Sequence, residues 1–216
     1  GEYITHPRFG PQFQAESCER KLPNTVESIR RYLSSGVIKG IGKVLAGKIV
    51  DTFGARTLEI MEHDPMRLQE VRGMSKAKCE EVANEAKHIF ALRSVISYFE
   101  NYGIKTRYAM RAFRVWGEKC RDIVETNPYL MCNEEIGMQF QAVEGYAHDL
   151  RIPRDSLCRI GAGMLHILRH NAGSGHTCIP LDRLAPKVCE FLSVNESAFY
   201  AAYQAELKEE HIVEYC

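Results

Sequence analysis

The chain has 216 residues and a formal net charge of zero, because 28 Lys and Arg balance 28 Asp and Glu. Hydrophobic residues make up 45% and charged residues 26%, which is typical of a globular protein and excludes a globally basic nucleic-acid binder. The eight cysteines form no C-x-x-C pair, which argues against a zinc ribbon or a thioredoxin-like site, and no apolar run reaches membrane-spanning length.

The first 22 residues alternate between apolar and polar side chains, which predicts a β-hairpin. Residues 3–5 and 13–18 would form the strands, and residues 7–11 the turn. Two strands alone are not stable in water, so we expect the hairpin to pack on helices or to belong to a larger sheet. Because this pattern begins directly at Gly1, we expect the chain to be a piece of a longer one.

A helix starting near residues 23–25 leads into residues 38–46, which have the spacing of a helix-hairpin-helix turn. Gly40 and Gly42 permit a tight turn and the close approach of another backbone, which a Cβ atom would block. The helix that follows presents unpaired amides and the positive end of its dipole, a natural seat for a phosphate. Basic residues surround it, and no acid lies between Ser28 and Val50. We therefore predict that a nucleic-acid phosphate is bound by Gly40, Ile41, Gly42, Lys43 and Val44.

A nucleotide-binding P-loop is the rival interpretation of these glycines. The P-loop pattern requires Gly where this chain has Val37, and a hydroxyl where it has Val44. No other stretch fits the pattern, and no catalytic constellation is visible. We therefore expect neither an ATP site nor catalytic residues in this chain.

Glycine followed by an apolar residue recurs about every 33 residues, which is the mark of an internal repeat. The recurring pairs begin at Gly40, Gly73, Gly103 and Gly137. The first and third units also match at Phe53-Gly54 with Trp116-Gly117, where a glycine would end a helix. They match again at Asp64-Pro65 with Asn127-Pro128, where a helix would begin. We predict two tandem pairs of helix-hairpin-helix units, covering residues 23–100 and 101–153.

The later units keep the second glycine less well. Ser75 replaces it in the second unit but still permits close approach, and lysines supply charge. Two interpretations of this unit stay open, a purely structural turn and a phosphate site made of Gly73, Ser75, Lys76 and Lys78. Lys105 and Gln139 replace the second glycine in the third and fourth units, and their long side chains would hold a phosphate away from the backbone. We predict that these two units, the second and degenerate pair, are structural.

Residues 105–121 contain six basic residues and one acid, Glu118, whereas acids dominate the end of the chain. A helix over residues 105–116 would place part of this charge on one stripe. The stripe, a secondary phosphate contact or simply a solvated face, consists of Arg107, Arg111 and Arg114.

Beyond residue 153 the pattern changes to helix, strand, helix, helix, strand, the order of a winged helix without a full wing. The helices are expected from Ser156 to about His170, near 181–192 and near 195–209, and the strands at 177–179 and 212–215. His166 and His170 lie one helical turn apart, but no acid or Cys has metal-ligand spacing with them, so we predict no metal site. The fold class is mainly α, with an N-terminal β-hairpin over 1–22 and a C-terminal winged-helix-like α/β segment over 154–216.

The succession of short segments resembles the N-terminal extension of RecD-like DNA helicases, the RecD/TraA family that includes exodeoxyribonuclease V alpha-subunit-like proteins. The resemblance covers nearly the whole chain and is carried by residues 5–13, 22–23, 29–33, 38–42, 127–129 and 175–177. Family members translocate 5′ to 3′ on single-stranded DNA with ATP, through RecA-like motor domains that follow this region. The resemblance implies that residues 1–22 are the last strands of an OB-like barrel. It also implies that ATP and Mg belong to motor domains outside this chain, with no cofactor here.

We therefore predict a non-catalytic DNA-binding region of a helicase for repair and recombination, which holds phosphates without reading bases. The expected partners are DNA (single-stranded or a duplex junction), the motor domains of the same polypeptide and another repair protein, with no membrane. The expected location is the bacterial cytoplasm, at the nucleoid. One alternative is a protein–protein scaffold, favoured by the acidic end and the neutral net charge. A helix-hairpin-helix glycosylase is a weaker one, because such enzymes have one hairpin in a larger fold.

Overall fold

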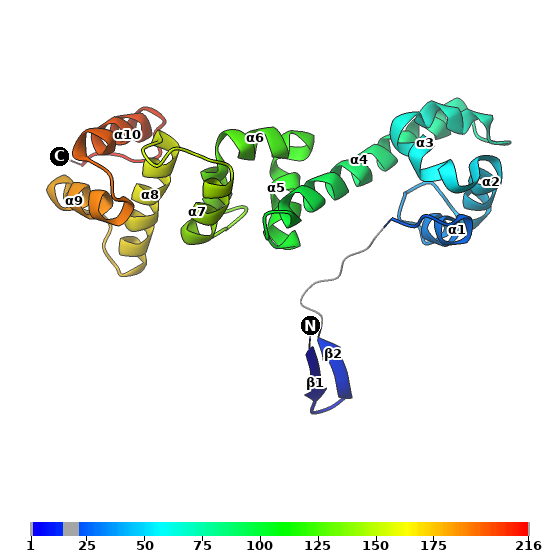
Figure 1. The fold of residues 1–216 in the computed structure, drawn as a ribbon, viewed down its shortest axis with the longest axis horizontal. Helices are drawn as coiled ribbons and strands as arrows, with labels where there is room; N and C mark the ends of the chain where they lie inside the picture. Colours follow the sequence, from blue (N-terminus) through cyan, green and yellow to red (C-terminus); the bar gives the residue numbers. More distant parts are fainter. Residues whose placement is uncertain (1, 15–21, 216) are drawn as a thin grey trace. The chain divides into compact units, whose positions relative to one another are not determined.

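The computed structural model describes residues 2–14 and 22–215, and most of them are helical, as predicted (Figure 1). They divide into two compact units. The first unit, Gly1–Ser94, holds the glycine turns at Gly40 and Gly73, and the second unit, Val95–Cys216, holds those at Gly103 and Gly137. None of the helices in these ranges has the length and apolar character needed to cross a membrane.

The predicted N-terminal hairpin is confirmed. Strand β1 (Glu2–His6) pairs antiparallel with β2 (Gly10–Gln14), so that Tyr3 lies opposite Phe13 with their ring centroids 5.0 Å apart. The second strand begins at Gly10, earlier than predicted, and the predicted strand residues 15–18 lie outside the described ranges.

The first unit is built from two hairpins of helices around one apolar core. Its helices are α1 (Val26–Ser34), α2 (Lys43–Phe53), α3 (Thr57–His63) and the first part of α4 (Lys76–Glu100), with 3-10 turns at Gly54–Arg56 and Pro65–Glu70. Thr25 caps α1 as expected, because its side chain accepts from the amide of Ser28 while the Ser28 hydroxyl accepts from the amide of Thr25. Packed between the helices, the core includes Leu33, Ile38, Ala46, Ile49, Leu68, Val71 and Val82.

The second unit repeats the same local geometry. It contains the end of α4, α5 (Thr106–Trp116), α6 (Cys120–Thr126) and α7 (Phe140–Asp149), with 3-10 turns at Gly117–Lys119 and Pro128–Cys132. The predicted glycine C-caps are confirmed: Gly54 has φ 58° and ψ −134°, and Gly117 has φ 59° and ψ −138°. Six residues after each repeated glycine lies a side chain that is 0% exposed, namely Ala46, Cys79, Ala109 and Val143.

The C-terminal segment contains α8 (Leu157–Gly173), α9 (Leu181–Leu192) and α10 (Glu196–Lys208), which pack against one another. The helices were predicted correctly, but the predicted winged-helix strands at 177–179 and 212–215 were wrong: both stretches are described and neither is a strand. A strand must satisfy its amides by pairing. Here Pro180, which has no amide, leads directly into α9, while Val213 and Tyr215 are 70% and 88% exposed. The two stretches therefore remain irregular chain around three helices.

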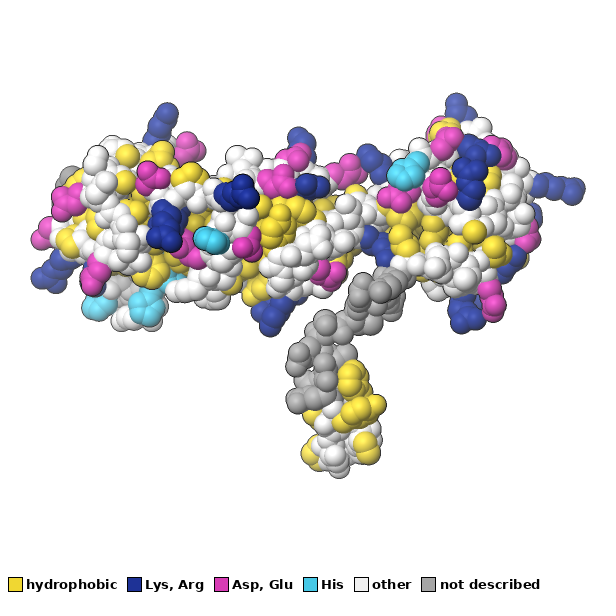
Figure 2. All heavy atoms as spheres, viewed as in Figure 1, with side chains coloured by type: hydrophobic (Ala, Val, Ile, Leu, Met, Phe, Trp, Pro, Cys, Tyr) yellow, Lys and Arg dark blue, Asp and Glu magenta, His cyan; other side chains and the backbone are white. Residues whose placement is uncertain are grey.

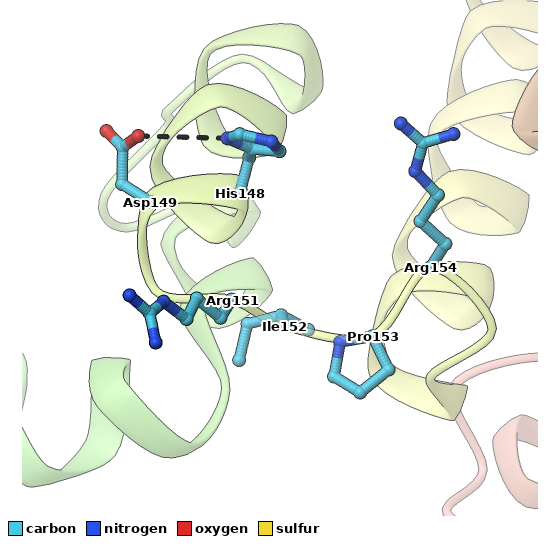
Figure 3. A pocket seen from close by; sticks show the side chains of 6 residues that line it. All are labelled: His148, Asp149, Arg151, Ile152, Pro153 and Arg154. Atoms are coloured by element: carbon cyan, nitrogen blue, oxygen red, sulfur yellow. Dashed lines mark ion pairs between the residues drawn. The ribbon is translucent and has the colours of Figure 1, made fainter.

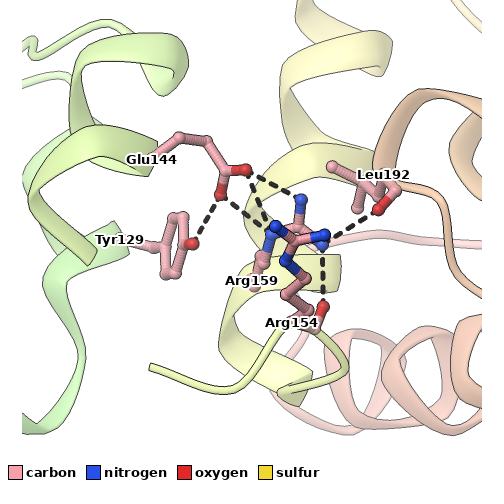
Figure 4. A network of polar contacts seen from close by, with 5 residues as sticks. All are labelled: Tyr129, Glu144, Arg154, Arg159 and Leu192. Carbon is pink, nitrogen blue, oxygen red and sulfur yellow. Dashed lines mark hydrogen bonds and ion pairs between the residues drawn. The ribbon is translucent and has the colours of Figure 1, made fainter. Parts of the chain in front are cut away.

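An arginine ties this C-terminal segment to the second pair of hairpins (Figure 4). Arg159 on α8 donates to both carboxylate oxygens of Glu144 on α7, at 2.8 to 3.1 Å, and to the carbonyl oxygens of Arg154 and Leu192. Tyr129 donates its hydroxyl to the same carboxylate. The Arg159 side chain is only 12% exposed and the Glu144 side chain 29%. The network therefore joins α7, α8 and the end of α9 at a place where the Arg159 and Glu144 side chains are largely shielded from water.

Candidate nucleic-acid interface

The turn between α1 and α2 holds its glycines at the surface and its apolar residues in the core. Ile38 and Ile41 are 0% and 3% exposed and anchor the turn, whereas Gly40, Gly42 and Lys43 are exposed. Gly40 has φ +87°, a conformation that side-chain-bearing residues rarely adopt. The next residue, Val44, is 76% exposed, so nothing in the described part of the protein covers it.

The first turn of α2 leaves its amides unoccupied. The amide of Ile41 donates to the Ile38 carbonyl at 3.2 Å, and that of Ala46 to the Gly42 carbonyl at 2.9 Å. Between them, within the described part of the chain, the amides of residues 42–45 donate to no protein acceptor, and no side chain caps the helix. Exposed amides at the positive end of a helix dipole attract an anion. The turn therefore has the properties of a phosphate seat.

Gly42 is not required by the backbone. It lies at the N-cap of α2 with φ −89° and ψ 174°, an extended conformation open to any residue. Lys105 and Gln139 occupy the equivalent N-cap positions of α5 and α7 in similar extended conformations. A Cβ atom at Gly42 would meet no atom within 4 Å. The missing side chain therefore leaves open space directly in front of free amides, a property that matters to a ligand rather than to the fold.

The second turn is a weaker version of the first. Gly73 has φ +90° and Ser75 is exposed, as the site requires. The Ser75 hydroxyl, however, accepts from the amide of Lys78 at 3.2 Å and so occupies one amide of α4. Lys76 is exposed, whereas the Lys78 ammonium pairs with Glu81 at 2.8 Å. Of the two lysines predicted for this site, Lys78 is therefore partly neutralised by Glu81, and Lys76 remains the exposed one.

The turns of the second unit have the same backbone but different surroundings. Gly103 and Gly137 have φ +68° and +70°, and Lys105 and Gln139 are exposed. Phe140, the first residue of α7, is 3% exposed and stacks on His166 of α8, with ring centroids 5.5 Å apart. Burial, together with nearby His170 and Arg169, lowers the pKa of His166. The fourth turn therefore begins a helix whose first side chain packs against protein.

The basic residues around the first turn differ in whether an acid neutralises them. Arg30 forms an ion pair with Asp51 at 2.6 Å, and Arg31 with Glu27 at 3.2 Å. Both acids lie directly outside the acid-free stretch from Ser28 to Val50, so the sequence did not show that these arginines are paired. Lys39 and Lys43 are exposed and have no acidic partner in the described ranges. Figure 2 shows Lys and Arg side chains projecting from the unit that holds α1–α3, with acidic side chains between them.

The predicted arginine stripe is not a row of equivalent free cations. Arg107 lies over the ring of Tyr108, 4.6 Å from its centroid, and donates to the hydroxyl of that residue. Arg111 donates to the carbonyl of Ile136 at 2.9 Å and so binds the backbone of the fourth turn. Arg114 is exposed. The structure therefore gives Arg111 a role within the fold that the helical stripe did not indicate.

A shallow depression lies at the end of α7, where His148 Nδ1 and Asp149 Oδ1 are 3.8 Å apart and the side chains of Arg151 and Arg154 point in different directions (Figure 3). The described residues contain no group of three or more His, Cys, Asp or Glu side chains placed to hold a metal ion.

Comparison with known proteins adds a family to this geometry. Residues 88–178 match the model of the ATP-dependent RecD2 DNA helicase HHH domain, a range that includes the turns at Gly103 and Gly137 but not those at Gly40 and Gly73. The chain is also similar to the ATP-dependent RecD2 DNA helicase of Deinococcus radiodurans, with 25% identity over 193 residues. That match covers 88% of this chain and 27% of the relative, so the chain spans about a quarter of the relative's length. No solved structure matches the chain.

Proposed function

We propose that this chain is a non-catalytic DNA-binding region of a helicase. Its residues 88–178 match the model of the RecD2 DNA helicase HHH domain, and its sequence is similar to a RecD2 DNA helicase. It holds DNA phosphates without sequence preference through the turn of the first unit. The chief contacts are the backbone amides of Gly42, Lys43, Val44 and Leu45, with Lys39 and Lys43 supplying positive charge. Gly73, Ser75 and Lys76 form a second, weaker contact.

A single observation carries this proposal. Gly42 stands where the equivalent turns have Lys105 and Gln139, in a backbone conformation that needs no glycine, and the space in front of it is empty. Removing a side chain there stabilises nothing in the folded protein. It does allow an anionic oxygen to approach the free amides at hydrogen-bond distance, where charge-assisted hydrogen bonds are strong.

The second unit supports a different role, that of a scaffold. The fourth turn leads into Phe140, which packs on α8, and Arg111 holds the backbone of that turn. We propose that this unit braces the rest of a larger helicase and contacts DNA at most through Arg114. ATP hydrolysis and 5′ to 3′ unwinding belong, in this proposal, to motor domains outside this chain, and the setting is the bacterial cytoplasm at the nucleoid.

Salt dependence tests the proposed phosphate contacts. Each neutralised phosphate contributes about one unit to the slope of log K against log salt concentration, so two contacts lower affinity about tenfold between 50 and 200 mM salt. We expect fluorescence anisotropy of labelled DNA to give this slope, and two oligonucleotides of unrelated sequence to bind equally within about twofold. Binding that ignores salt, or that prefers one sequence about tenfold, would contradict the proposal.

A further inference from the structure

In the first unit, each glycine turn is faced by a side chain from the opposite hairpin. The Nζ atom of Lys78, on α4, lies 2.6 Å from the position that a Cβ atom on Gly40 would occupy. Conversely, the Nζ atom of Lys48, on α2, lies 3.5 Å from the position of a Cβ atom on Gly73 and donates to the Arg72 carbonyl at 3.3 Å. Each hairpin thus places one lysine ammonium group beside the glycine turn of the other, and we call this arrangement the lysine exchange.

Glu81 holds one of these lysines in place. Its carboxylate pairs with Lys78 at 2.8 Å, and its other oxygen lies 3.2 Å from the Cβ position of Gly40. The Glu81 and Lys78 side chains are 55% and 35% exposed. Exposed ion pairs of this kind contribute little to stability, so a phosphate can compete with Glu81 for the ammonium group at small cost.

The second unit provides a comparison. Arg111 faces Gly137 in the same way as Lys48 faces Gly73, with its Nη1 atom 3.4 Å from the Cβ position. Gly145 occupies the position equivalent to Glu81, and nothing lies within 4 Å of the Cβ position of Gly103. A basic side chain facing the opposite turn therefore recurs in the repeat. In the first unit, such a side chain faces each of the two turns, and the amides of its first turn face open space.

We propose that Lys78, although it belongs to the second hairpin, supplies a further cationic side chain to the phosphate seat at the first turn, and that Lys48 does the same for the second turn. The two seats are then composite, and DNA bound at either turn contacts both hairpins. This inference rests on the proposed function. It assigns the two lysines to the turns opposite to those that their positions in the sequence indicate.

A pair of mutant cycles on the whole chain tests the exchange, with a labelled DNA duplex as the probe. Gly42→Leu blocks the first seat without adding charge and fits the extended backbone there. Lys78→Met and Lys48→Met each remove one charge but keep the stem, and Lys76→Met is the matched control. We expect Lys78→Met to weaken binding about fivefold alone and less than twofold in the Gly42→Leu background. Lys48→Met should weaken binding by the same factor in both backgrounds, as should Lys76→Met.

The outcomes separate the inference from the function on which it rests. Suppose that Gly42→Leu weakens binding, that its fold-change in affinity multiplies with that of Lys78→Met, and that it does not multiply with that of Lys48→Met. The exchange is then overturned, and each lysine contacts the phosphate at the turn of its own hairpin. If the fold-changes in affinity of both lysine variants multiply with that of Gly42→Leu, the seats are not composite and the inference is again overturned. If Gly42→Leu binds DNA like the unmodified chain, the proposed function fails first. Thermal unfolding of each variant, expected unchanged, confirms that the effects concern binding.

Discussion

Replacing Gly42 with glutamate is expected to weaken DNA binding at least about 30-fold, or roughly 2 kcal/mol, at low salt. The new side chain would enter the open space in front of the amides of residues 42–45 and place a carboxylate where the phosphate oxygen belongs. Several charge-assisted hydrogen bonds would be lost together, and each is worth more than a neutral one. Anisotropy titrations with the same labelled duplex measure the effect.

Matched substitutions at the two glycines of this turn separate binding from folding. Gly42→Ala should leave the free energy of unfolding nearly unchanged, because the backbone is extended and the space is empty. Gly40→Ala should cost about 1–2 kcal/mol, because φ is +87° and the Lys78 ammonium is in the way. Urea unfolding measures both. A Gly42→Glu chain that is folded and binds as well as the unmodified one would remove the turn from the DNA interface.

Replacing Arg159 with methionine is expected to lower the free energy of unfolding by about 3 kcal/mol. The change removes the Arg159 donors from the partly buried Glu144 carboxylate, which keeps only the Tyr129 hydroxyl among the described residues, and from the carbonyls of Arg154 and Leu192. Arg169→Met, on the same helix, removes one hydrogen bond to the Cys132 carbonyl and should cost less than about 1 kcal/mol. Equal effects of the two substitutions in urea unfolding would show that the network adds little.

The contribution of this network should also depend on pH. Burial acts to raise the pKa of Glu144, but the hydrogen bonds from Arg159 and Tyr129 outweigh it and hold the pKa below its usual value. A carboxyl with a lowered pKa in the folded state stabilises the protein above its unfolded pKa, and that stability is lost as pH falls through the folded value. The unfolded state is common to both chains, and without Arg159 the burial raises the pKa of Glu144 in the folded variant. The difference between the unmodified chain and Arg159→Met should therefore be largest at neutral pH and shrink as pH falls through the pKa of Glu144 in the two folded chains.

Local signals in the sequence predicted most of the helical architecture. Glycines at 54 and 117 end helices because the chain needs positive φ there, and the capping residue Thr25 starts one. These are short-range effects, so composition and spacing reveal them. The same holds for the turn at Gly40, whose apolar neighbours Ile38 and Ile41 are buried as its spacing requires.

Interactions between distant residues were the part that spacing could not supply. Asp51 neutralises Arg30, Arg111 bonds to the fourth turn, and Lys78 crosses to the first turn, all of which depend on how hairpins pack. The predicted strands at 177–179 and 212–215 failed for the same reason, because a short apolar run becomes a strand only if a partner is available. The equivalence of Lys48 and Arg111 is visible in the repeat, but the sequence does not show that each faces the glycine turn of the opposite hairpin.

Amide chemical shifts in a 15N-labelled chain titrated with duplex DNA test the central claim most directly, because they report on the donor groups themselves. We predict that the resonances of Gly42, Lys43, Val44 and Leu45 shift most, while those of Thr106 and Phe140, the first residues of α5 and α7, stay in place. If DNA binds and leaves these four resonances unmoved, the turn at Gly40 does not hold the phosphate.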